Sequence, residues 1–265
     1  MRQADRFGLI LEQLNRDSSV TVPMLATQLG VSAATIRRDL QMLESQQLLT
    51  RTHGGAVSTG VLYELPMRYR GGQQLPAKRA IASLAAQMLP AGAVSIALNG
   101  GSTTTELARA LAGRPLLRVV TNALNIAADL AVRPNIDLVV CGGSARSQSY
   151  ELVGPLAEMT LAHLNVDVAF IGVDGLSVTA GLTTYSEMEA HTDRALLAAA
   201  DRIVVVTDSS KLGRRAFARI CDIHGITDLV TDSNARPDDL AALAQAGVNV
   251  QVAVVGPAGQ GSAPA

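Results

Sequence analysis

The feature that most restricts the fold is a regular alternation of apolar runs and helical segments between residues 78 and 256. The runs are almost continuously apolar, which is typical of parallel strands covered by helices on both faces. The segments between them carry apolar residues at helical spacing, so the pattern predicts repeated strand–helix–strand units and an α/β domain with an open, mostly parallel sheet. The expected strands are 94–98, 117–121, 136–141, 166–172, 202–208, 228–232 and 248–255, and the expected helices are 103–112, 123–132, 155–164, 187–200 and 237–246.

The first 57 residues follow a different pattern. Apolar residues recur at helical spacing in 5–15, and Pro23 and Gly30 suit the first turn and the C-terminal end of a second helix. Ser32 is a good N-cap for a third helix, and 47–57 is typical of a short β-hairpin loosened by glycines. This order of elements predicts a winged helix-turn-helix.

The third helix and the hairpin carry the side chains expected to touch DNA. The second helix of a helix-turn-helix enters the major groove, where arginine bonds guanine or grips phosphate. An ordinary three-helix bundle with two surface arginines is the alternative that periodicity alone leaves open. The expected DNA-binding residues are Ser32, Thr35, Arg37, Arg38, Gln41, Arg51 and His53.

Between these two regions lies a stretch rich in Gly and Pro. We interpret it as a linker, with a short helical piece around 64–70. Residues 1–79 contain ten Lys and Arg and six Asp and Glu, whereas the rest of the chain contains twelve Lys and Arg and seventeen Asp and Glu. This distribution of charge fits nucleic-acid contact at one end of the chain. The expected domains are 1–57 (winged helix-turn-helix), 58–77 (linker), 78–256 (effector-sensing α/β domain) and 257–265 (flexible tail).

Composition excludes several other classes of protein. Hydrophobic residues make up 48% and charged residues 17%, so the chain is not of the disordered type. Cys141 and Cys221 are far apart and no His/Cys group has metal-ligand spacing, which predicts free thiols and no metal. Asp5 and Glu12 interrupt the apolar start, and no uncharged run could span a bilayer. We therefore expect a cytoplasmic protein without membrane association.

A glycine-rich turn follows the first expected strand. Asn99-Gly100-Gly101-Ser102-Thr103-Thr104 leads into a helix, so backbone N–H groups and hydroxyls could hold an anion there. The turn lacks the lysine of a P-loop and the G-x-G-x-x-G of a dinucleotide site, so we expect neither ATP nor NAD and no other cofactor. The alternative is that its hydroxyls merely cap the helix.

Other expected strand ends are also polar or rich in glycine. Ligands of open α/β sheets bind outside the carboxyl ends of the strands, so these segments could converge on one site. Lys211 could pair with a phosphate, and Asp174 or Asn99 could bind sugar hydroxyls, although each segment could also be a simple turn and Lys211 a solvated surface lysine. The expected effector-binding residues are Asn99, Gly100, Gly101, Ser102, Thr103, Thr104, Thr121, Asn122, Gly142, Gly143, Asp174, Gly175, Asp208 and Lys211.

Two motifs in the N-terminal region carry a family resemblance. TIRRDL at 35–40 and RTHGGA at 51–56 lie within a segment, 31–57, that closely resembles the signature of the DeoR family of bacterial transcriptional regulators. The resemblance continues to about residue 255. It implies a winged helix-turn-helix that binds operator DNA as a homo-oligomer, and a sensor domain that resembles the sugar-phosphate isomerase and transferase folds.

The resemblance also bears on the effector. NGGSTTTELA at 99–108, TNALNIA at 121–127 and DSSKLG at 208–213 look like the phosphate-binding turn, a second conserved segment and the lysine motif of the family. It implies that the effector is a small phosphorylated sugar or a related metabolite. Within the family, the sequence resembles more closely the branch that controls amino-sugar use. Two residues depart from the family: Asn99 replaces the usual Asp, and Asp193 precedes Arg194 where a Lys-Arg pair is common.

Three functions remain in competition. The first is a repressor of carbohydrate-utilisation genes that a phosphorylated sugar or amino sugar releases from DNA. The second is an isomerase- or deaminase-like enzyme with an appended N-terminal domain, for which Asp174, Glu187, Asp208 and Lys211 are the candidate catalytic groups; Asn99 is no base. The third is an activator or architectural DNA binder without a ligand. We expect the first, assign no catalytic residue, and expect an oligomer because operators usually have two half-sites.

Overall fold

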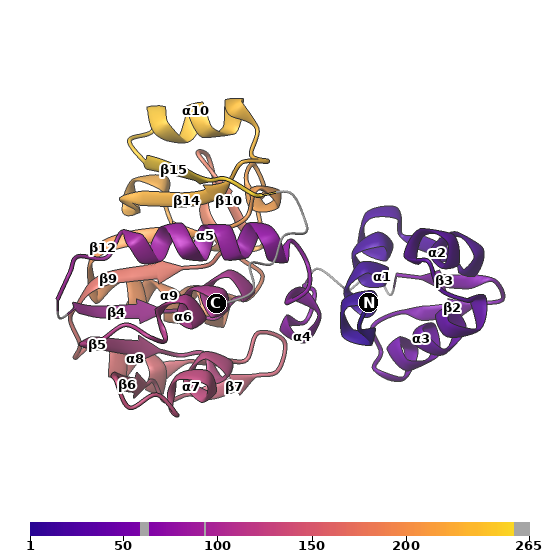
Figure 1. Cartoon of the computed structure of the whole chain (residues 1–265), viewed down its shortest axis with the longest axis horizontal. Coiled ribbons are helices and arrows are strands. Elements are labelled where there is room, and N and C mark those ends of the chain that lie inside the picture. Colours follow the sequence, from indigo (N-terminus) through magenta and orange to yellow (C-terminus); the bar gives the residue numbers. More distant parts are fainter. Residues whose placement is uncertain (59–63, 93, 257–265) are drawn as a thin grey trace, which may run out of the picture. The chain divides into compact units, whose positions relative to one another are not determined.

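The computed structural model describes residues 1–58, 64–92 and 94–256. The chain divides into two compact units, Met1–Gln73 and Gln74–Ala265 (Figure 1). Each unit has its own hydrophobic core, and the larger unit has a core layer on each face of its main sheet.

The first unit is a helical domain with a small antiparallel sheet. Its helices bury Ile10, Leu25, Ile36 and other apolar residues in one cluster, which explains the helical spacing of these residues in the sequence. The strand order is β1-β3-β2, so the hairpin of β2 and β3 extends the sheet beside the helices. The elements are α1 (Gln3–Asp17), β1 (Ser19–Thr21), α2 (Val22–Leu29), α3 (Ala33–Ser45), β2 (Thr50–Thr52), β3 (Gly55–Val57) and α4 (Met67–Arg70).

Local signals in the sequence set the ends of α2 and α3. The Thr21 hydroxyl accepts a hydrogen bond from the Met24 N–H and caps α2, which ends at Gly30 in the left-handed conformation with a φ of 65°. The Ser32 hydroxyl accepts from the Thr35 N–H at 3.1 Å and starts α3. The predicted helix-turn-helix and hairpin are therefore present.

The expected linker is largely ordered. Met67 and Tyr69 of α4 are buried, and the Tyr69 ring lies 5.7 Å from that of Phe7 in α1. Helix α5 (Leu75–Gln87) then begins inside the range 58–77. The Gly and Pro content indicated a linker, although the same stretch contains the apolar residues Met67 and Tyr69 that pack in the first unit. Residues 59–63 and the expected tail at 257–265 lie outside the described part of the chain.

The second unit contains a seven-stranded sheet in the order β15-β14-β12-β9-β4-β5-β6. All neighbouring pairs in it are parallel, as the long apolar runs predict. The strands are β4 (Val94–Leu98), β5 (Leu117–Thr121), β6 (Ile136–Val140), β9 (Val166–Ile171), β12 (Ala200–Val206), β14 (Asp228–Asp232) and β15 (Asn249–Ala253).

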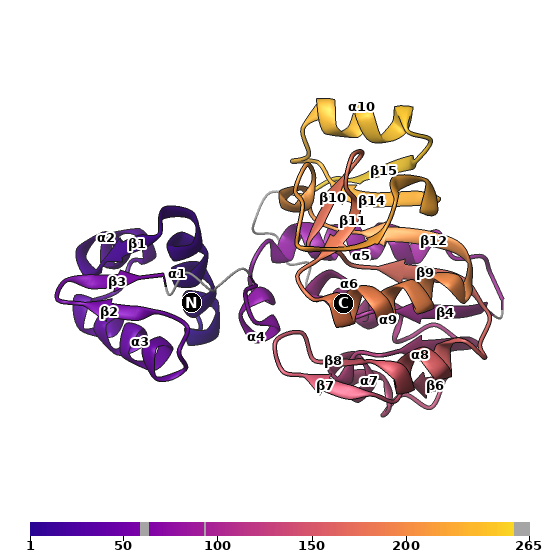
Figure 2. The same ribbon diagram turned by 180° about the vertical axis from the view of Figure 1, so that it is seen from behind.

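Helices cover both faces of this sheet. One core layer joins α5, α6 (Ser102–Leu111) and α7 (Leu124–Leu130) to side chains such as Ile96 and Leu98 of β4. Ala97 points to the other layer, which includes α8 (Pro155–Leu161), α9 (Glu187–Ala198) and α10 (Pro237–Gln245). Figure 1 shows α5 and α6 in front of the sheet, and Figure 2, seen from the opposite side, shows α8 and α9 in front of its other face. This two-sided cover is the α/β architecture expected from the sequence.

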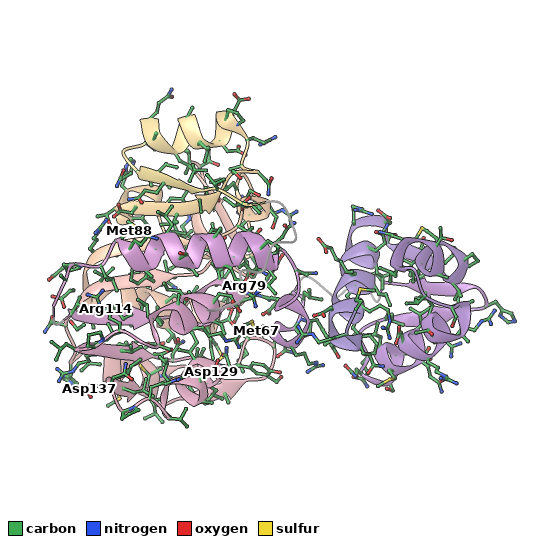
Figure 3. The ribbon with its side chains drawn as sticks, in the orientation of Figure 1. Met67, Arg79, Met88, Arg114, Asp129 and Asp137 are labelled. Carbon is green, nitrogen blue, oxygen red and sulfur yellow. The ribbon has the colours of Figure 1, made fainter. Side chains whose placement is uncertain are left out.

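Ion pairs link the three helices of the first layer. Arg79 of α5 contacts Glu106 of α6 at 3.3 Å, and Arg109 of α6 contacts Glu106 at 2.6 Å and Asp129 of α7 at 3.2 Å. Arg79 and Asp129 are labelled in Figure 3. The three helices are thus joined by a surface chain of charges in addition to their apolar contacts.

Two small antiparallel sheets accompany the main sheet. Strands β7 (Ser144–Arg146) and β8 (Glu151–Val153) form a hairpin, and β10 (Gly175–Ser177), β11 (Gly181–Thr184) and β13 (Ala218–Cys221) form a three-stranded sheet. The sequence pattern does not indicate these strands, because each has only three or four residues and pairs without a strong alternation. They matter because they follow β6 and β9 and bring further side chains to the carboxyl ends of the strands.

The chain reverses its winding at β4. Strands β5 and β6 follow on one side of β4, whereas β9 and the later strands lie on the other side. Open α/β sheets form a ligand-binding crevice at such a switch point, outside the carboxyl ends of the strands. The crevice is therefore expected after Leu98 and Ile171. None of the helices in the described part of the chain is long and apolar enough to cross a membrane.

Candidate DNA-binding and effector sites

Helix α3 presents two unopposed arginines. Arg37 and Arg38 are exposed, and within the described residues neither forms an ion pair. Ile36, Leu40 and Leu43 on the opposite face are buried in the core of the first unit. Gln41 is exposed beside the arginines, whereas Thr35 is half-buried and its hydroxyl bonds that of Ser32 at 2.9 Å. The hydroxyls of Ser32 and Thr35 thus serve the start of the helix, and the free cationic groups are Arg37 and Arg38.

A buried ion pair holds α3 against α1. Asp39 is 1% exposed and receives two hydrogen bonds from Arg6, from Nε and from Nη2, the latter at 2.9 Å. The hydrogen bond to Asp39 raises the pKa of Arg6. Asp39 immediately follows the two exposed arginines, so this pair sets the rotation of α3 that turns Arg37 and Arg38 outward.

The hairpin places His53 at its turn between β2 and β3, where it is exposed. Arg51 is exposed on β2, but its backbone N–H and guanidinium both contact Glu44 at 3.0 and 3.8 Å. Gly55 packs directly on β1: a Cβ there would lie 1.8 Å from the Val20 carbonyl oxygen. The second glycine of the motif is therefore needed for the sheet, and the seven predicted DNA-binding residues lie on one helix and one adjoining hairpin.

In the second unit, the glycine-rich turn after β4 leads into α6. Gly101 is the N-cap residue, has a φ of 145° and no side chain to cap the helix. The first N–H groups of α6 therefore lack a side-chain acceptor, which is the arrangement that binds anions at helix N-termini. The Thr104 and Thr105 hydroxyls donate to the Gly101 carbonyl oxygen at 3.0 and 2.6 Å, so they stabilise the turn itself.

Asn99 joins the two strands at which the winding reverses. Its Nδ2 donates to the Gly172 carbonyl oxygen at 3.0 Å, and its Oδ1 accepts from the Gly172 N–H at 2.8 Å. Nδ2 also lies 3.2 Å from Asp193 Oδ1. The Asn99 amide thus links β4 to the segment after β9, and its interpretation as a binder of sugar hydroxyls stays a prediction.

Four buried carboxylates gather beside this turn. Glu151 comes from β8, Asp174 from the loop after β9, and Glu189 and Asp193 from one face of α9; each is less than a tenth exposed. Arg146 contacts Glu189 at 2.8 Å, and Lys211 Nζ lies 3.7 Å from Asp174. The Thr184 hydroxyl lies 3.2 Å from Asp174 and 2.9 Å from Glu189. We call these four residues the acidic cluster.

Within the described residues, Glu151 and Asp193 accept hydrogen bonds from amides and form no ion pair, although Arg146 is the cross-strand partner of Glu151. Asn122 Nδ2 donates to Glu151 at 3.3 Å, and Asn99 Nδ2 donates to Asp193. Burial, followed by repulsion from the other carboxylates of the acidic cluster, raises the pKa of both carboxyl groups well above its usual range. Glu151 also lies against Gly100, where a Cβ would be 2.3 Å from its Oε1. The acidic cluster therefore borders the glycine-rich turn directly.

The other predicted effector residues lie near the strand ends but are occupied structurally. The Thr121 hydroxyl donates to the Leu98 carbonyl oxygen at 2.8 Å, and Asp208 caps the 3₁₀ turn η1 (Ser209–Lys211). Gly142 and Gly143 stand at the base of the β7–β8 hairpin, and Gly175 packs on the Arg214 backbone. The groups that remain to face a ligand are Ser102, Thr103, Lys211, the Oδ1 of Asn122 and the backbone of Gly100 and Gly101.

Sequence reasoning missed Glu151, Glu189 and Arg146. It named Glu187 as a candidate acid, but Glu187 is exposed and Glu189, two residues later, is buried. The spacing of Glu189 and Asp193 by four residues on a helix face that also carries Ala190 and Leu197 is a signal that could have found this pair, because acids are rarely buried without a partner.

The cysteines are free and shielded. Burial raises the pKa of both the Cys141 and the Cys221 thiols to about 11, with Asp222 adding to the effect at Cys221. Within the described residues no group of His, Cys, Asp and Glu is arranged to hold a metal ion. The polar chemistry of the second unit is therefore concentrated at the carboxyl ends of its strands.

Two family models match the chain in succession. A DeoR-like helix-turn-helix domain matches residues 6–60, and a DeoR C terminal sensor domain matches residues 73–233. The chain belongs to the DeoR family of transcriptional regulators. The family resemblance stated from TIRRDL and RTHGGA is thereby confirmed, and the protein is a DNA-binding regulator rather than an enzyme.

Relatives across this family align over nearly their whole length. The HTH-type transcriptional regulator GlpR of Haloferax volcanii is 37% identical over 251 residues, which cover 94% of this chain and 98% of the relative. A putative aga operon transcriptional repressor of Escherichia coli O157:H7 is 34% identical over 250 residues, 93% of each chain. The glycerol-3-phosphate regulon repressor of Escherichia coli K12 is 30% identical over 233 residues, covering 88% of this chain and 92% of the relative.

Solved structures show more distant likenesses. Ribose 5-phosphate isomerase A of Methanocaldococcus jannaschii covers 51% of this chain and 52% of its own, with a TM-score of 0.36 and 22% identity. The full-length sorbitol operon regulator SorC of Klebsiella pneumoniae covers 94% and 96%, with a TM-score of 0.37 and 12% identity.

Proposed function

We propose that this DeoR-family protein represses carbohydrate-utilisation genes and leaves its operator when a small phosphorylated sugar or amino sugar binds to the second unit. The observation that carries the DNA-binding part is the pair Arg37 and Arg38, exposed on α3 while Asp39 anchors the same helix to α1. Arginines held on a rigid helix can read guanine edges and grip phosphate. Arg51 and His53 on the adjoining hairpin would contact the DNA backbone.

The effector part of the proposal rests on the turn between β4 and α6. Gly101 leaves the first N–H groups of α6 without a cap, and the hydroxyls of Ser102 and Thr103 lie beside them, so the turn suits a phosphate. Lys211 supplies a cationic group near the same strand ends. The names of the relatives, which include a glycerol-3-phosphate regulon repressor, agree with a phosphorylated effector.

The proposal includes an assembly and a place of action. Operators read by a helix-turn-helix usually have two half-sites, so we propose a homo-oligomer that acts on DNA in the cytoplasm. A ligand changes DNA affinity only through its different affinity for the two arrangements of the DNA-binding heads. Binding of the effector would favour an arrangement that no longer fits the spacing of the half-sites.

The test starts by selecting duplexes that the full-length protein binds from a random-sequence library. We expect the double variant Arg37→Ala/Arg38→Ala to bind the selected duplex at least about 30-fold more weakly, because each arginine contributes on the order of 1–3 kcal/mol. The slope of log K against log salt should fall by about one for each phosphate that the variant no longer neutralises. Arg133→Ala, an exposed arginine of the second unit, is the matched control.

Phosphorylated sugars added to the wild-type complex test the effector part. At least one should lower occupancy of the selected duplex, and Ser102→Ala/Thr103→Ala should weaken that response without changing DNA affinity in its absence. Unchanged DNA binding by the double arginine variant would contradict the DNA-binding assignment. Indifference of the complex to every sugar phosphate would contradict the effector assignment.

A further inference from the structure

The acidic cluster is short of cations. Of its four buried carboxylates, Glu189 has Arg146 and Asp174 has Lys211 as a cationic neighbour. Glu151 and Asp193 are 4% and 2% exposed, and in the described part of the chain neither forms an ion pair. Ionised carboxylates are not stable in a buried site without a compensating charge, so these two groups either bind a proton or receive a cation from outside the protein.

A second observation points to an absent donor. Asn122 is fully buried, and its Oδ1 has no hydrogen-bond partner among the described residues, although its Nδ2 donates both to Glu151 Oε2 at 3.3 Å and to the Leu152 carbonyl oxygen at 3.2 Å. Those two acceptors fix the orientation of the amide, because exchanging O and N would set oxygen against oxygen. An unsatisfied acceptor therefore lies beside Glu151 and calls for a donor from a ligand.

We propose that Glu151, Asp193 and Asn122 Oδ1 bind a protonated amino group of the effector. An ammonium has three N–H donors and no acceptor, which matches two carboxylates and one amide oxygen. A neutral hydroxyl would leave both carboxylates uncompensated. As far as the structure describes the chain, the acidic cluster also lacks the arrangement that would hold a metal ion. The effector class is thus a small molecule with a free amine, neither acetylated nor replaced by hydroxyl.

The amine site and the anion site adjoin each other. Glu151 packs against Gly100, in the turn that ends at the N-terminus of α6. A phosphate bound in that turn would be repelled by an ionised Glu151 unless a positive charge lay between them. A ligand that carries both a phosphate and an ammonium a few bonds apart supplies this charge itself. This inference rests on the proposed sensing of a phosphorylated effector by the second unit.

The experiment compares matched ligands by calorimetry with the full-length protein. The pairs are glucosamine 6-phosphate with glucose 6-phosphate, galactosamine 6-phosphate with galactose 6-phosphate, and serinol phosphate with glycerol 3-phosphate. N-acetylglucosamine 6-phosphate serves as the acetylated comparison. We expect the amine of at least one pair to bind about tenfold or more tightly than its hydroxyl and acetylated counterparts, as for a hydrogen-bonded charge pair.

Variants connect that preference to the cluster. The variant Glu151→Gln/Asp193→Asn should bind the amine and hydroxyl compounds with about equal affinity. It should bind the hydroxyl compound at least as tightly as the wild type does. Glu187→Gln, an exposed acid at the start of α9, should retain the full preference. Amine binding should also release more protons than hydroxyl binding, since the ammonium displaces protons that the raised pKa values of Glu151 and Asp193 favour. The groups that face these two carboxylates are Asn99, Asn122, Asp174 and Glu189, with Arg146 and Lys211 behind them.

The other outcomes would overturn either the amine site or the proposed effector class. Equal binding of hydroxyl and amine compounds, or a preference that survives Glu151→Gln/Asp193→Asn, overturns the amine site and leaves the sensing of sugar phosphates intact. Stabilisation by magnesium or calcium alone also overturns it. Failure of every phosphorylated compound to bind overturns the proposed effector class, and with it the inference that depends on that class, while DNA binding through Arg37 and Arg38 stands.

Discussion

At the scale of single residues, the protein contains buried carboxylates of two kinds, one with a cationic partner and one without an ion pair among the described residues. Arg6 and Asp39 form a closed pair in which both carboxylate oxygens accept hydrogen bonds from the guanidinium. Glu151 and Asp193 are as deeply buried but face neutral amides and other acids. The first arrangement serves the fold of the DNA-binding unit. The second has a cost in stability that a structural role does not explain, and perturbed acids of this kind cluster at functional sites.

The closed pair gives a stability prediction. Asp39→Ala should destabilise the first unit by about 3 kcal/mol, because it leaves the largely buried Arg6 guanidinium without its counter-charge. Hydrogen exchange of backbone amides in α1 and α3, measured in the full-length protein, should accelerate accordingly. Asp17→Ala, which removes an exposed acid of α1, should destabilise the unit far less than Asp39→Ala does. Equal protection in both variants would show that the Arg6–Asp39 pair does not anchor α3.

At the scale of elements, close backbone approach fixes the hairpin of the first unit. Gly55 begins β3 and pairs with Thr21 of β1 and Thr52 of β2. Its missing Cβ leaves room for the Val20 carbonyl oxygen, whereas Gly54, at the turn, has nothing within 4 Å of a built Cβ. The two adjacent glycines of the motif therefore have different roles: Gly55 allows close packing of β3 on β1, and Gly54 lies in the turn.

This difference can be measured with paired substitutions. Gly55→Ala should push β3 away from β1, increase hydrogen exchange at Val20 and Ala56, and weaken DNA binding through loss of the hairpin. Gly54→Ala should leave both exchange and binding close to wild type, since it meets no neighbouring atom. A Gly55→Ala variant with wild-type exchange in β1 and β3 would contradict the packing role of Gly55.

At the scale of the whole molecule, positive charge is local rather than general. Met1–Gln73 holds eight Lys and Arg against six Asp and Glu, a smaller excess than in residues 1–79 because Lys78 and Arg79 belong to α5. What favours DNA contact is therefore the position of Arg37 and Arg38 on an exposed face, not the net charge of the unit. In the second unit, by contrast, four acids are gathered in the interior, in the acidic cluster.

That internal charge predicts how stability depends on pH. The pKa values of Glu151 and Asp193 are raised in the folded state, so between about pH 4, the ordinary value, and those raised values the folded state binds more protons than the unfolded state. The free energy of unfolding of the second unit should therefore fall as the pH rises from about 4 toward those raised values. Below about pH 4 it should fall as well, because Asp228, beside Arg202, has a lowered pKa.

Thermal unfolding of the ligand-free protein across this pH range provides the measurement. Glu151→Gln/Asp193→Asn should flatten the decline above about pH 4 and raise the unfolding temperature at the alkaline end of the range. Glu187→Gln should keep the wild-type profile, because this side chain is exposed. A wild-type profile that rises over the same interval would show that both carboxylates are ionised and compensated in the empty protein.

The main elements could be predicted because their signals are local. The apolar runs at 94–98 and 228–232 coincide with β4 and β14, and helix caps such as Ser32 and Gly30 mark their elements directly. The strands of the β7–β8 hairpin and helix α5 were not predicted. The former are too short for a periodic signal, and the start of the latter was assigned to the linker on its Pro and Gly content.

The sites divide in the same way. The glycine-rich turn is contiguous in sequence, so its position between β4 and α6 could be predicted from residues 99–104 alone. The acidic cluster joins residues of β8 and α9 with the end of β9, and no local pattern connects Glu151 to Asp193. Asn99 and Thr121 sit at the predicted strand ends, but their hydrogen bonds to Gly172 and Leu98 could be known only once the strands were placed side by side.

The turn after β4 and the acidic cluster are built from different materials. Main-chain N–H groups and glycines form the turn, so its grip on an anion survives most changes of side chain, provided the backbone keeps its shape. The cluster consists entirely of side chains, which come from the β7–β8 hairpin, helix α9 and the loop after β9. The proposed anion site therefore depends on backbone shape, whereas the proposed amine site depends on particular side chains. Under the proposed recognition of an amine, substitutions at 151 and 193 would change the preferred inducer and leave the seven-stranded sheet unaltered.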